Sequence, residues 1–450
     1  MSWNFDNTYV HLPRTFYKDM ELEPISEPKL VKFNENLARE LGLPSDLEAG
    51  LFTGNLLPEG GQPIAQAYAG HQFGHFNMLG DGRALLLGEQ IAPDGRRFDI
   101  QLKGSGRTPY SRGGDGRAAL GPMLREYLIS EAMFALGIPT TRSLGVATTG
   151  DITLRERPLA GAILTRVAAS HLRVGTFEYG ARWATDSELQ ALTEYAMERH
   201  FPSVSNSESY LPFLQEVAKS QAELIAKWQL VGFVHGVMNT DNVSISGETI
   251  DYGPCAFLDT YDPETVFSSI DADGRYKFGN QPYIGAWNLA RLVEALSKFI
   301  TREEAESVIA HYWEVYNEAW LDGMARKLGL SGSGFEYKDL ILSLLDLMKK
   351  SEADYTNTFV ALMSEKSLPG FEAWIEEWQS KNPSLELMKA NNPKVIPRNH
   401  NVEQALMLAE HGDMSAFDKL LTAVQNPYEE APEFMEPAEK GVCYQTFCGT

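Results

Sequence analysis

The pattern of the hydrophobic residues changes near residue 168, and this change limits the folds open to the chain. Before it, residues 84–91 and 97–103 predict two strands joined by a tight turn at 93–95. Residues 162–167 predict a further strand. Beyond residue 168, apolar residues recur at helical spacing. A small strand-rich part followed by a larger helical part favours two lobes over a single sheet with helices on both faces.

The predicted helices are bounded by capping residues and by glycine or proline. One covers 117–136, and another begins at Thr185, a good N-cap residue. The remaining predicted helices cover 211–230, 284–299, 303–328, 338–350 and 402–409. Residues 1–78 show only short helical patterns broken by proline and glycine, and 426–440, rich in Pro and Glu, predict a solvated tail.

Charge and apolar patterning exclude several classes of partner. Lys and Arg number 39 against 61 Asp and Glu, which gives a net charge of −22. Such a field repels nucleic acid and anionic membranes, so we expect neither as a partner. No segment approaches the ~18–20 apolar residues of a membrane span, and the start lacks a signal-peptide apolar stretch. We therefore expect a cytoplasmic protein that would bind a polyanion only through a local basic pocket or a metal.

Glycines and arginines gather around the predicted strands. Residues 80–83 (GDGR) precede the first strand, and 103–106 (KGSG) and 113–117 (GGDGR) follow the second. Glycine lets the backbone approach phosphate oxygens, and arginine supplies positive charge. Glycine clusters alone usually mark turns, but their crowding with arginines in so acidic a chain favours a phosphate site. The basic set comprises Arg83, Arg107, Arg112, Arg117, Arg166 and Arg173.

Lys103 ends the second predicted strand, and a helix follows it along the chain. Kinase-like folds place their phosphate-binding lysine at such a strand, paired with a glutamate on the next helix. Glu126 and Glu131 are the candidate partners, and Glu126 is preferred because it lies nearer the middle of the helix. Taken alone, a lysine at this place is far more often an exposed residue at a strand end.

The segment 232–253 (GFVHGVMNTDNVSISGETIDYG) carries the most specific chemistry. A short hairpin, with strands at 243–245 and 249–250, is predicted to bring Asp251 back toward Asn242. An Asn and an Asp so placed form a hard-oxygen site suited to Mg²⁺. His235 and Asn242 keep the spacing of the kinase catalytic loop, but Val237 stands where its aspartate would be. Asp241 is the only nearby replacement.

Several motifs together resemble the selenoprotein O family, a protein-kinase-like family also called protein adenylyltransferase. They are GHQFG at 70–74, LGDGR at 79–83, KGSG at 103–106, GDGR at 114–117, HGVMNTDN at 235–242 and DYGP at 251–254. The resemblance runs over nearly the whole chain. It implies an α+β, protein-kinase-like two-lobed fold, with a small strand-rich N-lobe and a larger helical C-lobe.

The resemblance also implies an activity: ATP bound in an orientation flipped relative to kinases, with AMP transferred to Ser, Thr or Tyr hydroxyls of protein substrates. Asp241 would be the catalytic base, and Glu126 would pair with Lys103. Asn242 and Asp251 would hold Mg²⁺, although Mn²⁺ accepts the same ligands. The residues that would bind the nucleotide are Gly80, Gly82, Arg83, Lys103, Asp115, Gly116, Arg166, Arg173 and Asp251.

The chain has three cysteines, too few for a disulfide framework. Many members of the family carry a selenocysteine or cysteine near the C-terminus, and Cys448 matches that place. Cys443 precedes it at a C-x₄-C spacing rather than C-x-x-C. Both an inert pair and a redox role of the tail therefore stay open. Because the N-terminus lacks the presequence of mitochondrial members, a bacterial cytoplasmic form is expected.

We accordingly expect four parts in a monomer. An N-terminal extension (1–78) packs on the core, an N-lobe (79–167) carries the nucleotide-binding loops, a helical C-lobe (168–425) carries the metal and catalytic loop, and an acidic tail (426–450) holds two cysteines. Protein adenylyltransferase is the leading hypothesis. The alternatives are a divergent protein kinase, against which Val237 argues, and a nucleotide-binding pseudokinase scaffold, against which the Asn242 and Asp251 pair argues.

Overall fold

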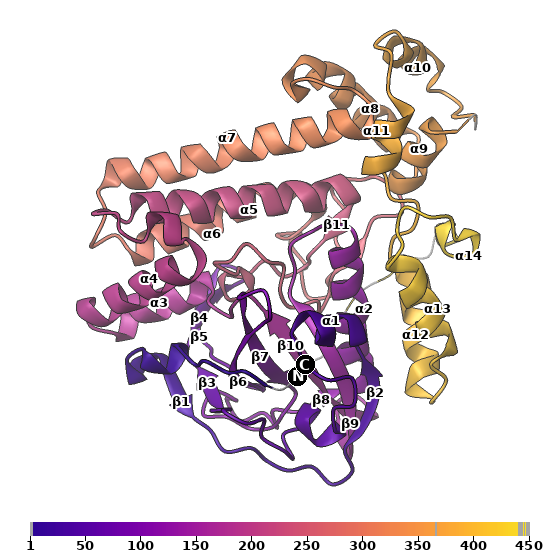
Figure 1. Cartoon of the computed structure of the whole chain (residues 1–450). Helices are drawn as coiled ribbons and strands as arrows, with labels where there is room; N and C mark the ends of the chain where they lie inside the picture. Colours follow the sequence, from indigo (N-terminus) through magenta and orange to yellow (C-terminus); the bar gives the residue numbers. More distant parts are fainter. Residues whose placement is uncertain (1–2, 365–366, 440–443, 445, 447–450) are drawn as a thin grey trace.

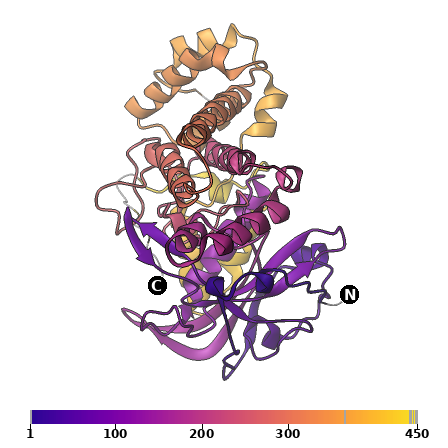
Figure 2. The same ribbon diagram turned by 90° about the vertical axis from the view of Figure 1, so that its left-hand side faces the viewer.

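The computed structural model describes residues 3–364, 367–439, 444 and 446. Cys443 and Cys448, the predicted redox residues, lie outside the described residues. Figure 1 shows the strands, indigo to purple, gathered below the long magenta and orange helices. The same separation is visible from the side in Figure 2. The chain is thus a mixed α/β protein whose strands come mainly from its first part.

The largest sheet is antiparallel throughout and has the strand order β1-β3-β6-β7-β10-β9-β2, with β8 paired to β10. Its strands are β1 (Tyr17–Asp19), β2 (Lys29–Phe33), β3 (Ile64–Gln66), β6 (Ala84–Ile91), β7 (Arg97–Lys103), β8 (Ala118–Ala119), β9 (Arg142–Leu154) and β10 (Pro158–Ala168). The two small sheets are hairpins of β4 (Ala69–Gln72) with β5 (His75–Met78) and of β11 (Phe233–Val234) with β12 (Ala256–Phe257).

The strand predictions around the glycine loops are confirmed. β6 and β7 have the predicted bounds, and the predicted strand at 162–167 lies within β10. Lys103 is paired with Ala84 on one side and Leu164 on the other, so the lysine sits inside the sheet rather than at an edge. Short helices are present in residues 1–78, as α1 (Glu35–Glu40) and the 3₁₀ turns Tyr9–His11, Arg14–Phe16 and Ala49–Phe52, but this part also contributes β1 to β5, which were not predicted. Proline and glycine there break the chain into strands too short to show alternation.

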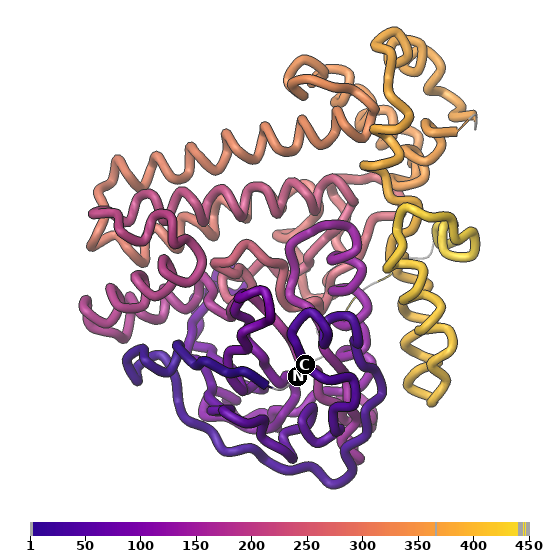
Figure 3. Tube along the Cα trace, in the orientation of Figure 1, coloured from indigo at the N-terminus to yellow at the C-terminus, as the bar shows by residue number. Residues whose placement is uncertain are grey.

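The helices follow mainly after β10. They are α1 (Glu35–Glu40), α2 (Leu120–Ala135), α3 (Val174–Trp183), α4 (Asp186–His200), α5 (Leu211–Val231), α6 (Gln281–Ala295), α7 (Arg302–Lys327), α8 (Lys338–Lys350), α9 (Tyr355–Leu362), α10 (Glu372–Gln379), α11 (Leu385–Asn391), α12 (Asn399–Glu410), α13 (Ser415–Val424) and α14 (Pro432–Met435). The long helices α5 and α7 run side by side, as the trace in Figure 3 shows.

The predicted helices correspond to α2, α4, α5, α6, α7, α8 and α12, with ends that differ by a few residues. Thr185 caps α4 through a reciprocal pair of bonds with Glu188, as expected of this residue. The tail prediction needs correction, because Ala431, Phe434 and Met435 pack against the main core. Within the described residues, no helix combines the length and apolar character needed to cross a bilayer.

Helix α2 joins the sheet to the helical part. Its buried residues contact β9 and β10, and it also packs against α12 and α13. Leu124 and Leu128 are fully buried, and each such side chain contributes roughly 1.5–3 kcal/mol of hydrophobic stabilisation. Because α2 packs against the sheet and also against α12 and α13, the position of the Glu126 carboxylate relative to the sheet is well defined.

Candidate active site

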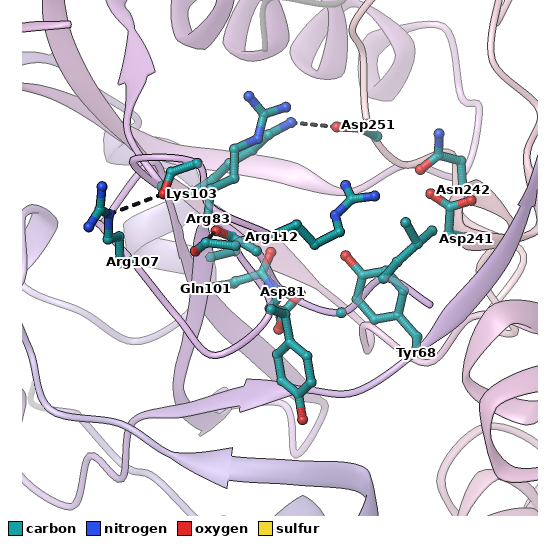
Figure 4. A pocket seen from close by; sticks show the side chains of 18 of the residues that line it. Tyr68, Asp81, Arg83, Gln101, Lys103, Arg107, Arg112, Asp241, Asn242 and Asp251 are labelled. Atoms are coloured by element: carbon teal, nitrogen blue, oxygen red, sulfur yellow. Dashed lines mark hydrogen bonds and ion pairs between the residues drawn. The ribbon is translucent and has the colours of Figure 1, made fainter. Parts of the chain in front are cut away.

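A cavity of about 600 Å³ opens between the large sheet and the helical part. Figure 4 shows Arg83, Lys103 and Arg107 towards one side of it and Asp241 and Asn242 towards the other, with Asp251 joined to the basic side by an ion pair. Segments far apart in sequence therefore contribute opposite walls. The predicted nucleotide, metal and base residues all line this cavity: Gly80, Gly82, Arg83, Lys103, Asp115, Gly116, Arg166, Arg173, Asp241, Asn242 and Asp251.

Lys103 lies at the centre of a buried charge network. Its Nζ is 2.7 Å from Glu126 Oε2 and also forms an ion pair with Asp251. Arg166, from β10, joins the same two acids at 2.5 Å from Glu126 and 3.4 Å from Asp251. The predicted pairing of Lys103 with Glu126 is confirmed. Glu131, the other candidate, pairs instead with Arg142 at 2.7 Å.

The network keeps its carboxylates ionised. Burial alone would raise the pKa of Asp251, but the charges of Lys103, Arg166 and Arg83 outweigh it and hold this pKa far below its usual range. Burial likewise opposes the ionisation of Glu126, and Arg166 and Lys103 again lower its pKa. Two cations and two carboxylates thus stabilise one another where solvent is excluded. This wall of the cavity is fixed as charged at any physiological pH.

The loop that carries the predicted metal ligands differs from the predicted hairpin. Residues 243–245 and 249–250 do not pair with each other: Ser244 bridges to Arg173, and Thr249 bridges to Thr140. The loop is therefore held by the chain segments on either side of it. Asp251 has φ 70, a left-handed conformation unusual for a residue other than glycine. Strain of this kind is concentrated at functional sites.

Asn242 and Asp251 both line the cavity. Asn242 Nδ2 donates to the carbonyl of Val237 at 3.1 Å. Val237 itself lines the cavity, so an apolar side chain stands where a kinase would place a carboxylate. Among the described residues, no cluster of three or more His, Cys, Asp or Glu side chains is placed to bind a metal.

Asp241 is buried at the opposite wall, beneath hairpin β4–β5. A Cβ added at Gly70 would overlap the Asp241 carboxyl, so glycine alone permits this approach. Oδ1 of Asp241 is buried without a hydrogen-bond partner. Burial raises the pKa of Asp241 to about 7, although Arg173 partly opposes the shift. This carboxyl can therefore gain and lose a proton near neutral pH.

A triad not foreseen from the sequence supports Asp241. Glu178 on α3 accepts hydrogen bonds from Thr240 Oγ1 and from the ring of His71. The backbone N–H of His71 donates to Thr240 Oγ1 at 2.7 Å, which closes the set. Thr240 precedes Asp241 and His71 follows Gly70, so Glu178 holds the two chain segments that meet at the Asp241 carboxyl. His71 lies in the GHQFG motif, but nothing in that motif predicted a contact with Glu178.

Arg173 spans the cavity floor. Its guanidinium lies over the ring of Tyr68 at 4.4 Å, and Nη1 donates to the carbonyl of Asp241 at 2.9 Å. Asp81 lies 3.9 Å from it. Burial raises the pKa of Asp81 to about 6, an effect partly offset by Arg173 and by the Gln66 N–H. Asp81 and Tyr68 also line the site; Asp81 lies in the GDGR motif but was not singled out as a site residue, and no motif pointed to Tyr68.

The rim of the cavity is formed by the glycine-rich loop at 104–117. Asp115 in this loop accepts two hydrogen bonds from Arg155, at 2.8 and 3.1 Å. Arg155 directly follows β9, a strand that the sequence did not reveal. Arg107, Arg112 and Arg117 also line the cavity. The glycine-rich loop and its arginines therefore line one cavity, together with Arg155, which was not predicted.

Comparison with known proteins matches residues 1–374 to a family model described as protein adenylyltransferase SelO. The chain is 56% identical to the protein nucleotidyltransferase YdiU of Brevibacillus brevis over 480 residues, which covers 100% of this chain and 98% of that protein. It is 56% identical to the YdiU protein of Anoxybacillus flavithermus over 479 residues, with 100% and 99% covered. For the Bacillus thuringiensis protein of that name the identity is 55% over 482 residues, with 100% and 99% covered.

Proposed function

The chain belongs to the protein adenylyltransferase SelO family of protein nucleotidyltransferases, and we propose that its basic cavity binds ATP so that AMP, and not the γ-phosphate, reaches a protein hydroxyl. The observation that carries this proposal is the distribution of charge around the cavity. Arg83, Lys103 and Arg166 crowd one wall, and Asp241 stands unpaired at the other. A triphosphate held by the cations would keep its terminal phosphate away from the base.

The protein-kinase-like, two-lobed arrangement is part of this proposal. Three features support it: the strand-borne Lys103 bound to Glu126 on α2, Asp251 in a D-Y-G sequence, and a cavity between the sheet and the helices. In such a fold the nucleotide would lie with its triphosphate beside Lys103. Arginines beyond the usual kinase set would surround the β- and γ-phosphates, so the α-phosphorus would face the acceptor.

Asn242 and Asp251 fit a divalent cation. Mg²⁺ is usually held by one or two carboxylate or amide oxygens together with substrate phosphates, and these two side chains offer such oxygens at one end of the cavity. We assign them as the ligands, with Mg²⁺ or Mn²⁺ equally suited to oxygen donors. When bound, the ion would neutralise charge on the phosphate oxygens.

Asp241 is assigned as the general base. Its carboxylate would accept the proton of a Ser, Thr or Tyr hydroxyl while that oxygen bonds to the α-phosphorus of ATP. The bond from the α-phosphorus to the bridging oxygen of the β-phosphate breaks, and pyrophosphate leaves. Lys103, Arg166 and Arg83 stabilise the negative charge on the leaving group. A pKa of about 7 lets Asp241 both accept this proton and release it to solvent.

The decisive experiment compares the fate of the two ends of ATP. The purified chain is incubated with Mg²⁺, a bacterial protein extract and ATP labelled at either the α- or the γ-phosphorus. We expect protein-bound label from α-labelled ATP only, with one pyrophosphate released per AMP transferred. Protein-bound γ-label would indicate a divergent kinase and would contradict the proposal.

The matched variants Asp251→Asn and Asp262→Asn separate enzymatic labelling from contamination. Asp251 lies in the charge network, whereas Asp262 pairs at the surface with Lys349. We expect Asp251→Asn to lower α-label transfer by at least about 100-fold, the scale of a lost electrostatic group at a reacting centre. Asp262→Asn should label like the wild type. Equal labelling by both variants would favour a catalytically silent scaffold.

A further inference from the structure

Arg125 lies on α2 directly before Glu126, and its side chain binds the chain just after Asp251. Nε donates to the carbonyl of Gly253 at 3.2 Å, and Nη2 donates to the carbonyl of Cys255 at 2.6 Å. Arg125 is only 7% exposed. Successive residues of a helix point about 100° apart. The same turn of α2 therefore directs Glu126 to the charge network and Arg125 to the segment that follows Asp251.

The rest of the Arg125 guanidinium binds helix α12. Nη1 donates to Glu403 Oε1 at 2.9 Å, and Nη2 also donates to Asn399 Oδ1 at 3.2 Å. Asn399 and Glu403 are four residues apart and therefore lie on one face of α12. This helix, in yellow at the right of Figure 1, packs against α2. Arg125 thus joins α2, α12 and the D-Y-G segment through the donors of one planar group.

The segment that Arg125 binds includes a backbone conformation that needs support. Asp251 has φ 70, and the Gly253 N–H donates back to the Asp251 carbonyl at 3.0 Å. A left-handed residue other than glycine persists only where the surrounding structure fixes it. Tyr252 Oη forms a hydrogen bond with Thr140 Oγ1, and β12, which follows, pairs with β11. The two bonds from Arg125 fix carbonyls of the stretch between Asp251 and β12.

We propose that Arg125 is a positioning residue for the divalent cation: it binds the carbonyls after Asp251 and so holds the Asp251 carboxylate in place for the metal. This inference rests on the proposed function, in which Asn242 and Asp251 hold the ion. Arg125 itself lines an adjoining cavity of about 240 Å³ between α2, α12 and the D-Y-G segment. Removing a group that orients a metal ligand typically lowers metal affinity by about 10- to 100-fold.

A purely structural role of Arg125 is the alternative. In that case the guanidinium joins α2 to α12, and its loss lowers the unfolding temperature and the fraction of folded enzyme. The affinity of the folded molecules for metal would then be unchanged. Metal affinity, measured apart from activity, therefore distinguishes a positioning residue from a structural one.

The test compares Arg125→Met with Arg157→Met. Arg157 lines the same small cavity and pairs with Glu410 of α12 at 2.8 Å, so each variant removes one positive charge and one contact to α12. Calorimetry measures the affinity for a nonhydrolysable ATP analogue without metal and with saturating Mn²⁺. The ratio of the two affinities is the metal-dependent gain, which reports the coupling between metal and nucleotide.

We expect the metal-dependent gain to be about tenfold smaller in Arg125→Met than in the wild type. The metal-free affinity should be unchanged, because Arg83, Lys103 and Arg166 are intact. Arg157→Met should match the wild type in both affinities. An equal gain in Arg125→Met and Arg157→Met would overturn the positioning role.

Arg125→Lys, with Arg157→Lys as its control, keeps the test decisive if the methionine variant does not fold. Lysine retains the charge beside Glu403, but one ammonium group does not reproduce the spread of donors that a guanidinium directs at several acceptors. We expect a smaller metal-dependent gain in Arg125→Lys than in Arg157→Lys. The concentration of Mn²⁺ that half-saturates AMP transfer should rise in parallel. A normal gain in Arg125→Lys would contradict the inference.

The outcomes separate this inference from the proposed function. If the wild type transfers α-label but the gain does not distinguish the Arg125 variants from the Arg157 variants, the adenylyltransferase proposal stands and the positioning role fails. If the wild type transfers no α-label, the proposed function fails. If the wild type shows no metal-dependent gain, the assignment of Asp251 as a metal ligand fails, and the role of Arg125 fails with it.

Discussion

The two ends of the cavity hold their carboxylates in opposite states. At the end formed by β7, α2 and β10, Glu126 and Asp251 are matched by Lys103 and Arg166, and their pKa values lie below the usual range. At the end beneath hairpin β4–β5, Asp241 is buried without a partner for Oδ1, and its pKa is raised to about 7. Aspartate thus has a pKa far below its usual range at one end, in Asp251, and a pKa raised to about 7 at the other, in Asp241.

The difference has a simple physical origin. Both ends are buried, and burial alone disfavours every carboxylate. At the first end two cations lie within ion-pair distance and outweigh that cost. At the second end Arg173 directs its Nη1 to the backbone carbonyl of Asp241 rather than to its carboxyl. A site that binds a polyanion and also moves a proton needs both environments, because a strongly paired carboxylate is a poor base.

Asp241→Asn should lower the rate of α-label transfer most, because it removes the proposed proton acceptor. The residues around Lys103 and Arg166 stay unchanged in this variant. We expect α-label transfer to fall about 10²–10⁴-fold, the usual contribution of a general base, while ATP affinity is retained. The wild-type rate should rise with pH and level off above about 7, since the base acts when ionised and its pKa is raised to about 7.

The control is Asp339→Asn, which alters an exposed carboxylate in the first turn of α8. Transfer rates are measured with α-labelled ATP from pH 5 to 9, and ATP affinity is measured by calorimetry at each end of that range. A normal rate in Asp241→Asn, or a wild-type rate that falls on approaching pH 7 from below, would show that the unpaired end has no role as a base.

The contrast between the ends was only partly visible in the sequence. Lys103, Glu126, Asn242 and Asp251 were predicted because each stands at a recognisable place on a strand, a helix or a loop motif. Of the contacts among them, the Lys103–Glu126 ion pair was predicted and is present, whereas the ion pair between Lys103 and Asp251 was not predicted. The predicted hairpin that was to join Asn242 to Asp251 is wrong, because segments at Thr140 and Arg173 bind this loop instead.

The second end depends on contacts between distant segments. Gly70 and Glu178 both lie far from Asp241 in the chain, yet together they determine how the carboxyl is buried and how its loop is held. No short sequence pattern predicts that Gly70 and Glu178 pack around the Asp241 loop. The same holds for Arg155, whose bond to Asp115 requires β9, a strand that the sequence did not reveal. Local motifs predict chemistry, whereas burial and hence pKa arise from tertiary packing.

Lys103→Met tests the end of the cavity formed by β7, α2 and β10. Its effect on activity should lie between those of Asp241→Asn and Glu178→Gln. The substitution leaves Glu126 and Asp251 with Arg166 as their remaining close partner and removes one charge facing the nucleotide. We expect ATP affinity to fall by about 10- to 100-fold, the value of one or two charge-assisted hydrogen bonds. Lys32→Met is the control, since Lys32 pairs with Asp418 at the surface.

Affinity is measured by calorimetry with a nonhydrolysable ATP analogue and Mg²⁺. If Lys103→Met binds the analogue as tightly as Lys32→Met does, the paired end contributes nothing to nucleotide binding. The pH dependence supplies a further check on the contrast. Transfer by Lys103→Met should keep the wild-type midpoint near pH 7, because Lys103 acts at the other end of the cavity.

Glu178→Gln should change the rate of α-label transfer least, and its expected effect is on the pH dependence of that rate. The negative charge of Glu178 contributes to the raised pKa of Asp241, and glutamine keeps an oxygen that can accept from Thr240. Removing the charge should therefore shift the midpoint of the pH–rate profile to lower pH, by less than about one pH unit. Glu303→Gln, an exposed change in the first turn of α7, should leave the midpoint in place. A lower rate with an unmoved midpoint would assign Glu178 a purely structural role, whereas a shift to higher pH would contradict the electrostatic account of the unpaired end.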